Sequence, residues 1–292
     1  MNTTRRHLLG GLALLGLPLP TLTLAQQAKV LPLSTPGLDH LDVIVPDVEK
    51  TTKFYMGVFK TTLHAQPFQG GFRYFVLLGP LPENRAVGYL AIGDSRGRGT
   101  YIGHFCTSVT EWRRDSQAIF AAMADQFRGA GLGDFPGSTG VGGIFADPDG
   151  IEIQFLPSPD TLVSAATPSE LVPGGQGLVT PLRVDNVVLH VSDLEKALAY
   201  YRILYGKEST SDAKRATFAF ANGSTLILEP TAYIYGRGEP RIARFGIRVQ
   251  PFDRKAVSER ITSLGGKVLE AESSAVLRFS DSDGNVAELV PA

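Results

Sequence analysis

Apolar and polar residues alternate from Asp39 to Val45. Leu41, Val43 and Val45 form the apolar side of this alternation, and His40 lies on the other side. A period of two residues is typical of a β-strand that buries one face in a core. The pattern therefore predicts a strand with a histidine near its start.

A helix is expected directly after this strand, and the whole pattern occurs twice. Asp47 lies where a helix N-cap belongs, and Phe54 and Tyr55 fall on the buried side of the following turns. A second copy begins at Asp185 and aligns without a gap. The identical pairs are Asp39/Asp185, Val45/Val191, Asp47/Asp193, Glu49/Glu195, Lys50/Lys196 and Tyr55/Tyr201. An internal repeat of this length indicates two tandem domains of related structure.

Each copy continues with strand signals and a further strand-and-helix unit. Strands are predicted at 72–79, 86–92, 101–109, 216–220, 225–228 and 242–249, and further helices at about 111–128 and 253–264. Each half ends in an Asp-x-Asp-Gly turn and a last strand, at 147–155 and 281–289. The segment between the halves is rich in Pro, Gly, Ser, Ala and Thr. We therefore expect domains at 36–157 and 182–292, joined by a linker at 158–181.

Residues 1–25 are predicted to be a signal peptide. Arg5 and Arg6 precede an apolar run from Leu8 to Leu19, which is too short to span a bilayer. The paired arginines resemble a twin-arginine export signal, and an ordinary secretory signal is the alternative. Either route predicts an exported, periplasmic protein with no stable membrane span after cleavage.

Charge balance argues against a nucleic-acid partner, and the cysteine count excludes an internal disulfide bond. The 28 basic and 29 acidic residues balance, and no basic cluster of the nucleic-acid-binding kind is present. We therefore expect no nucleic-acid partner. Cys106 is the only cysteine, so no internal disulfide can form.

The two-module domains, with histidines in opening strands and Asp-Pro-Asp-Gly at 147–150, resemble the vicinal oxygen chelate superfamily. This superfamily includes glyoxalase I, bleomycin-resistance proteins and type I extradiol dioxygenases. The resemblance implies an α+β fold of two tandem domains. In each domain, paired βαβββ modules would form a cup-shaped mixed sheet, and metal-dependent members hold a divalent ion in the cup.

The resemblance also implies the metal ligands of the first domain. His40 and His104 match two ligand positions, while the third, usually Glu, is Gln154 here. Glu152 shares a strand face with Gln154, so it is the alternative third ligand and a candidate catalytic carboxylate. Two histidines and a carboxylate would leave open positions for substrate and O₂. We expect Fe(II) or Mn(II), with Zn(II) as the alternative. Cys106 shares the face of His104, but a small buried hydrophobic residue is the simpler interpretation.

The second domain is predicted to have a degenerate site. Asn186, Arg244 and Glu288 occupy its three matching positions, and Arg244 would place a positive charge where a metal belongs. We expect Arg244 to pair with Glu288. Extradiol dioxygenases of this length carry their ligands in the C-terminal domain, so the reversed order here argues against a simple transfer of that activity.

Some further side chains are weaker candidates for the first site. Asp42, Arg73, Tyr74 and Tyr89 could line the cup, and the loop 96–99 could act as a lid or bind an anionic group. The simpler expectation for each is ordinary sheet surface or a solvated turn.

Three functions remain open from the sequence. The first is a dioxygenase that acts on a small catechol-type or vicinal-oxygen substrate. The second is a glyoxalase-type lyase or isomerase, in which Glu152 moves a proton. The third is a metal-free protein that binds a small molecule, as resistance proteins do. The histidine pair favours a metal-dependent enzyme, and the tandem length favours the dioxygenase. Exposed sheet edges suggest a homodimer.

Overall fold

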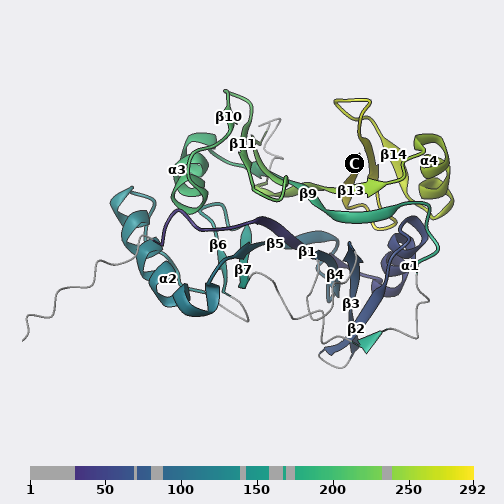
Figure 1. The fold of residues 1–292 in the computed structure, drawn as a ribbon, viewed down its shortest axis with the longest axis horizontal. Helices are drawn as coiled ribbons and strands as arrows, with labels where there is room; N and C mark the ends of the chain where they lie inside the picture. The colour runs from purple at the N-terminus through teal and green to yellow at the C-terminus, as the bar shows by residue number, and fades with distance from the viewer. Residues whose placement is uncertain are drawn as a thin grey trace, which may run out of the picture.

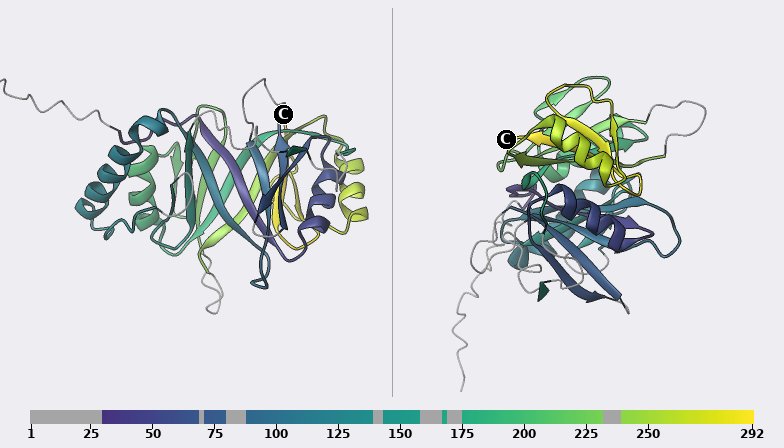
Figure 2. Two further views of the ribbon diagram at one scale, coloured as in Figure 1. Left: turned by 90° about the horizontal axis from the view of Figure 1, so that it is seen from below. Right: turned by 90° about the vertical axis from the view of Figure 1, so that its right-hand side faces the viewer.

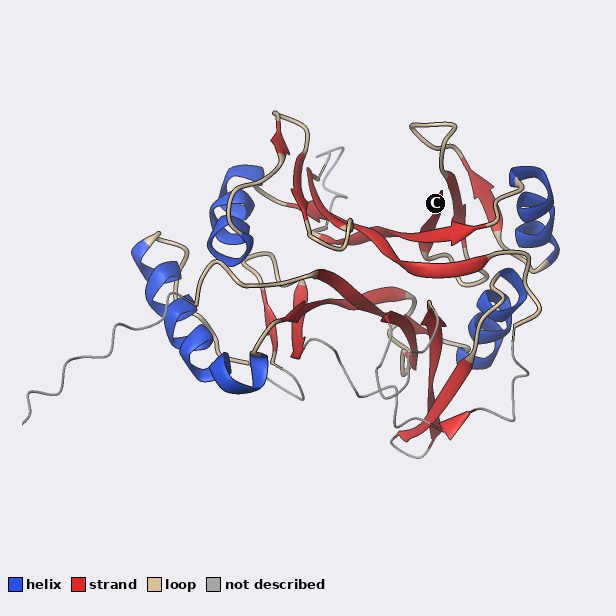
Figure 3. Cartoon of the chain, in the orientation of Figure 1, coloured by secondary structure: helices blue, strands red, loops and turns tan. Residues whose placement is uncertain are grey.

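Two mixed sheets stack back to back, with a pair of helices at each end of the stack (Figures 1 and 3). The computed structural model describes residues 30–68, 71–79, 88–138, 143–157, 167–168, 175–231 and 239–292. The strand order of the first sheet is β6-β7-β5-β1-β4-β3-β2-β8, and that of the second is β10-β11-β12-β9-β13-β16-β15-β14. The predicted signal peptide lies outside the described residues.

The elements follow the predicted repeat. The first sheet consists of β1 (Gly37–Val45), β2 (Leu63–Phe68), β3 (Gly71–Leu78), β4 (Gly88–Asp94), β5 (Tyr101–Val109), β6 (Ile144–Ala146), β7 (Glu152–Pro157) and β8 (Thr167–Pro168). The second consists of β9 (Thr180–Val191), β10 (Thr210–Ser211), β11 (Ala216–Ala219), β12 (Thr225–Pro230), β13 (Arg241–Gln250), β14 (Lys267–Leu269), β15 (Leu277–Ser280) and β16 (Val286–Pro291). The helices are α1 (Val48–Val58), α2 (Trp112–Gly129), α3 (Leu194–Tyr205) and α4 (Arg254–Ser263).

Aspartate side chains begin three of these helices. Asp47, Asp193 and Asp253 each accept a hydrogen bond from the backbone N–H three residues later, at 3.0, 3.0 and 3.1 Å. The helix α2 has no such side-chain cap, and Glu111 before it takes the left-handed conformation with φ 60°. The predicted N-cap at Asp47 is therefore confirmed.

The topology confirms the predicted α+β fold of paired modules. In each sheet the opening strand pairs in parallel with the last strand of its own module, β1 with β4 and β9 with β12. It also pairs antiparallel with the opening strand of the next module, β5 or β13. Among the described residues, two strands after α2, β6 and β7, join the sheet beside β5, while β8 pairs with β2 at the other edge.

Alternation along β1 separates a core from a functional face. Leu41, Val43 and Val45 are fully buried in a core that both sheets share. His40 and Asp42 lie on the opposite face of the sheet. The edge strands of each sheet curve away from the other sheet, so the concave faces point in opposite directions (Figure 3). We call the concave face of the first sheet the first cup and that of the second sheet the second cup.

Reciprocal hydrogen bonds join the two domains. The Tyr55 hydroxyl on α1 donates to Asp281 Oδ2 at 3.0 Å, and the Tyr201 hydroxyl on α3 donates to Asp147 Oδ2 at 2.8 Å. The helices pair across the same interface, α1 beside α4 and α2 beside α3 (Figure 2). Residues that are identical in the two copies therefore hold the domains together in a nearly symmetric way.

The described parts of the predicted linker pack onto the first domain. The strand β8 pairs with β2, and Lys60 N donates to Val179 O at 2.7 Å. Val179 is buried, so this segment adds apolar contacts to the core. The strand β9 begins at Thr180, two residues before the predicted domain boundary. No helix in the described part of the chain is long and apolar enough to cross a membrane.

Candidate metal centre

Three polar side chains converge from adjacent strands of the first cup. His40 on β1 places its Nε2 3.3 Å from Nε2 of His104 on β5 and 2.9 Å from Oε1 of Gln154 on β7. All three residues are at most 6% exposed. Three buried polar groups of this kind are costly unless something satisfies them together.

Carboxylates hold the outer nitrogen of both histidines. Asp39 Oδ1 lies 2.8 Å from His40 Nδ1, and Asp42 Oδ2 lies 3.4 Å from His104 Nδ1. A carboxylate only accepts, so it suits the tautomer with the proton on Nδ1, and in that tautomer the lone pair of Nε2 points inward. The Gln154 amide oxygen is also an acceptor. Three electron-rich atoms thus face one another, which is the arrangement that a bound cation would satisfy.

The spacing and the charge also fit a divalent metal. Ligands about 2.1 Å from an octahedral ion lie about 3 Å from their neighbours, close to the two separations found here. The donors themselves are neutral, but Asp39 and Asp42 place two negative charges directly behind the histidines. Asp39 and Asp42 therefore supply part of the negative charge that a Glu at position 154 would have supplied.

Asp42 is kept ionised by its neighbours. Burial alone would raise its pKa, but hydrogen bonds and charge from His104 and Arg73 outweigh burial and hold the pKa below its ordinary value. Arg73 donates to Asp42 Oδ1, on the side away from the histidine. A Cβ at Gly103 would lie 3.1 Å from Asp42 Oδ2, so a glycine there leaves room for the carboxylate.

Contacts around His40 fix its ring. Ser108 Oγ donates to Asp39 Oδ2 at 2.8 Å, and the Tyr89 ring stacks on His40 with a centroid separation of 4.2 Å. Sequence reasoning suggested Tyr89 as a cup residue but missed the roles of Asp39 and Ser108. The identity of Asp39 and Asp185 between the two copies was the available signal. Tyr74, by contrast, belongs to the core on the other face.

Comparisons with known proteins agree with this geometry. Residues 37–155 match the family model of the Glyoxalase/Bleomycin resistance protein/Dioxygenase superfamily. The match covers the first domain and leaves the second domain outside it. A comparison with curated protein sequences gave no match.

Solved structures share the two-domain vicinal oxygen chelate fold at low sequence identity. A halotolerant catechol dioxygenase, BphC, is 15% identical with TM-score 0.59, over 88% of this chain and 87% of its own. The 2,3-dioxygenase LapB from Pseudomonas sp. KL28 is 13% identical with TM-score 0.59, over 89% and 93%. The Mn(II)-bound glyoxalase from Novosphingobium aromaticivorans is 14% identical with TM-score 0.55, over 88% and 82%. These similarities establish the fold.

The structure places the two candidate third ligands differently. Gln154 lies beside the histidines, whereas Glu152 is exposed and lines a cavity of about 530 Å³ together with Asp42. Glu152 pairs with His104 along the β5–β7 ladder, but no side-chain hydrogen bond or ion pair among the described residues joins it to His40 or His104. Gln154 is therefore the side chain that lies beside the two histidines, and Glu152 lies at the border of the group.

Cys106 lies inside the same cup but is fully buried. Ligand atoms of Asp39, His40 and Cys106 lie within 4.8 Å of one another, the one group of acidic, histidine and cysteine residues in the described chain that could hold a metal together. Because Asp39 already accepts from His40 and Ser108, we assign Cys106 a packing role, as expected from the sequence.

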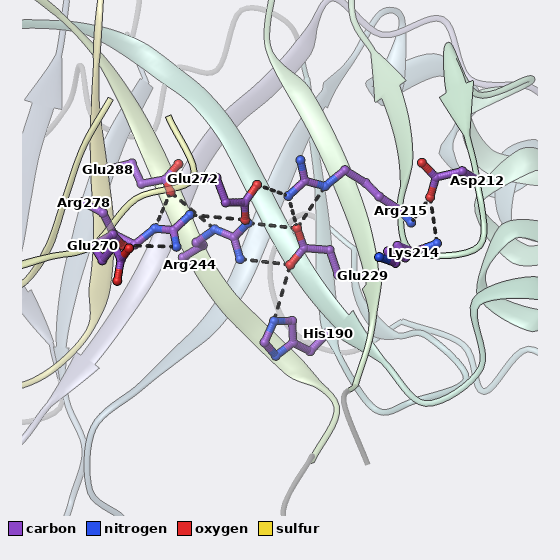
Figure 4. Close-up of polar contacts among 10 residues, drawn as sticks. All are labelled: His190, Asp212, Lys214, Arg215, Glu229, Arg244, Glu270, Glu272, Arg278 and Glu288. Atoms are coloured by element: carbon purple, nitrogen blue, oxygen red, sulfur yellow. Dashed lines mark hydrogen bonds and ion pairs between the residues drawn. The ribbon is translucent and has the colours of Figure 1, made fainter. Parts of the chain in front are cut away.

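The second cup is filled by paired charges (Figure 4). Arg244 Nε lies 3.4 Å from Glu288 Oε1, which confirms the predicted pair. Both terminal nitrogens of Arg244 also donate hydrogen bonds to the Glu229 carboxylate, at 2.9 and 3.0 Å. Further pairs link Arg278 to Glu288 at 2.7 Å and Arg215 to Glu272 at 2.9 Å. An arginine thus occupies the place that a vicinal oxygen chelate metal would take.

Proposed function

We propose that this protein is a metal-dependent enzyme of the vicinal oxygen chelate superfamily that acts as a dioxygenase on a small substrate with two adjacent oxygens, such as a catechol. The observation that carries the proposal is the convergence of His40 Nε2, His104 Nε2 and Gln154 Oε1 with both outer nitrogens held by carboxylates. Fe(II) or Mn(II) suits this nitrogen and oxygen donor set, and Zn(II) is the alternative.

In this proposal some side chains of the first cup bind the metal and others orient the metal-binding side chains. His40, His104 and Gln154 would hold the metal, and Asp39 and Asp42 orient the histidines. When bound, the metal would supply Lewis acidity and open positions for the substrate oxygens and O₂.

Two further residues would act on the substrate rather than the metal. The Tyr89 ring covers one face of His40 and limits access of water. Glu152, exposed at the adjoining cavity, would accept a proton from a substrate hydroxyl.

A glyoxalase-type lyase or isomerase is the second candidate, and the position of Glu152 favours it. A carboxylate at the wall of a cavity beside a metal centre could move a proton between neighbouring carbons of a substrate. A metal-free binding protein is the third candidate, and it requires that the converging acceptors of the first cup be satisfied without a cation.

Oxygen uptake distinguishes the first two candidates. The chain from residue 26 would be loaded with Fe(II) or Mn(II) without oxygen and mixed with catechol or 4-methylcatechol, and O₂ consumption would be followed with an electrode. We expect one O₂ consumed for each ring cleaved, and no uptake by His104→Ala. Isomerisation of a hemithioacetal without O₂ uptake would instead support the glyoxalase-type activity.

We also propose that the protein is exported to the periplasm. The paired Arg5 and Arg6 before a short apolar run support this proposal. Fractionation of cells that express the full chain tests it. We expect the protein in the periplasm and the Arg5→Lys/Arg6→Lys variant in the cytoplasm, and equal distribution of both would contradict twin-arginine export.

A further inference from the structure

Two cavities meet beside the metal centre. The cavity of about 530 Å³ and a neighbouring one of about 320 Å³ share Asp42, Ile44 and Arg98 in their walls. Asp42 also contacts the outer nitrogen of His104, so both cavities are separated from the candidate metal site by the Asp42 and His104 side chains. Volumes of this size suit a small ligand.

Three arginines at these cavities have no acidic partner among the described residues. They are Arg96, Arg98 and Arg241, and all three line the cavities. The arginines of the second cup, in contrast, are paired with glutamates. Guanidinium groups without an acidic partner favour an anionic ligand, because planar guanidinium groups bind carboxylates with two parallel hydrogen bonds.

The backbone fixes Arg98 in its place. Ser95 N donates to Val45 O at 2.9 Å, and Arg98 N donates to Ser95 O at 3.1 Å. Arg96 between them is held in the left-handed conformation with φ 51°, which costs energy for a residue other than glycine. The Arg98 side chain is itself placed by a hydrogen bond from its Nε to Ser95 O at 3.4 Å and by the Tyr101 ring, whose centroid lies 5.7 Å from Cζ.

The second domain contributes Arg241. This residue is the first of β13 and reaches the larger cavity with its neighbours Pro240 and Ile242. Because Arg73 already neutralises Asp42, Glu152 is the one remaining acid at this cavity, against Arg98 and Arg241. With Arg73 counted against Asp42, arginines outnumber acids by one among the described residues at the larger cavity.

We infer that the substrate carries an anionic group, most simply a carboxylate, which Arg98 and Arg241 bind between the two domains. This inference rests on the proposed function for the place of the chemistry and adds the substrate class. The exposed Phe72 and the half-buried Ile44 beside the arginines would contact an aromatic ring. The degenerate second domain thereby gains a role in selecting the substrate.

Calorimetry on the Mn(II)-loaded chain without oxygen tests the inference through binding alone. The probes are 3,4-dihydroxyphenylacetate and 4-ethylcatechol, which have a similar ring and size but differ in charge. We expect the acid to bind at least about tenfold more tightly than the neutral catechol. Arg98→Gln and Arg241→Gln should each lose about tenfold for the acid and less than about twofold for the neutral compound. Arg114→Gln, on the exposed face of α2, is the matched control and should change neither.

Equal affinity for the two probes, or an equal loss for both in the variants, would overturn the inference, as would the absence of binding by either probe. Arginine-dependent binding of the acid without O₂ uptake would support the substrate class and contradict the dioxygenase. O₂ uptake with no preference for the acid would support the dioxygenase and contradict the inferred substrate class.

Discussion

The two cups begin from the same repeat but hold opposite kinds of polar group. The first presents His40, His104 and Gln154, three neutral donors with carboxylates behind them. The second presents arginine at the position of His104, in contact with Glu229 and Glu288. A cup can therefore satisfy its buried polar groups with a cation from solution or with an arginine of its own, and the choice decides whether a metal site exists.

The position of one carboxylate, Asp42 on β1 in the first cup and Glu229 on β12 in the second, accounts for much of this difference. Strand pairing makes Arg73 and Arg215 equivalent, since Tyr74 pairs with Ile92 as Ala216 pairs with Leu228. In the first cup the arginine contacts Asp42 on the opening strand. In the second it contacts Glu229 on β12, where the first cup has Gly93. A carboxylate on β12 lies in reach of Arg244, whereas one on β1 orients a histidine.

Removal of Arg244 should give the largest effect. Arg244→Ala leaves Glu229 and Glu288 with fewer partners in a buried site, so the free energy of unfolding should fall by about 3–5 kcal/mol. Urea denaturation followed by circular dichroism measures it. Arg114→Ala on the exposed face of α2 should leave the value essentially unchanged. A loss below about 1 kcal/mol for Arg244→Ala would show that this network does not stabilise the second cup.

The turn aspartates should behave alike in the two halves. Burial raises the pKa of Asp147 to about 6 from 3.8, against the hydrogen bonds it accepts from Ile151 N and Tyr201, and burial also raises the pKa of Asp281. The folded chain thus favours protonated Asp147, so this stabilising contribution is present below about pH 4 and is lost as the pH rises through 6.

Asp147→Asn should remove this pH dependence. Relative to the variant, the parent should lose up to about 3 kcal/mol of stability between pH 4 and 7.5. Urea denaturation across this range gives the difference, and Asp281→Asn should show the same sign. A difference that stays constant with pH would mean that Asp147 is ionised throughout.

Removal of the equivalent aspartates, Asp39 and Asp185, should affect metal affinity only in the first cup. Asp39→Asn removes the negative charge that orients the ring, so metal affinity should fall about 10- to 100-fold. Competition with a coloured chelator measures it. Asp185→Asn, the equivalent change in the second domain, breaks the pair with Arg248 but should leave metal affinity unchanged. Equal losses in both variants would indicate a general effect on folding.

A carboxylate in place of the amide should have the smallest effect. Gln154→Glu adds a charged ligand, so metal affinity should rise about tenfold. The same chelator competition tests it. A fall in affinity would indicate that Gln154 does not face the metal.

Much of the fold could be predicted because periodicity and caps are local. The alternation around His40, the N-cap at Asp47 and the turn at 147–150 all carry their structure in neighbouring residues. Pairing of Arg244 with Glu288 was also predictable, since the repeat aligns them with a metal site. Contacts between distant residues were not, because strand pairing brings Arg244 to Glu229 and the domain interface brings Tyr55 to Asp281.

The candidate site could also be predicted only in part, because its geometry depends on contacts between distant residues. Strand parity placed Glu152 and Gln154 on one face but could not rank them, since the depth of the site depends on the register of β7 against β5. The repeat marks Asp39 through its identity with Asp185, but the role of Asp39 depends on a side-chain rotation toward His40 and Ser108, which strand periodicity does not predict.

Metal content is the most direct measurement of the central claim that only the first cup binds a cation. The chain from residue 26 would be purified without chelator and analysed by mass spectrometry with His40→Ala, His104→Ala and His190→Ala. We expect about one iron, manganese or zinc per parent chain, retained in His190→Ala of the second cup and lost in His40→Ala and His104→Ala. No metal in the parent after anaerobic reconstitution, or metal retained without His40 and His104, would contradict it.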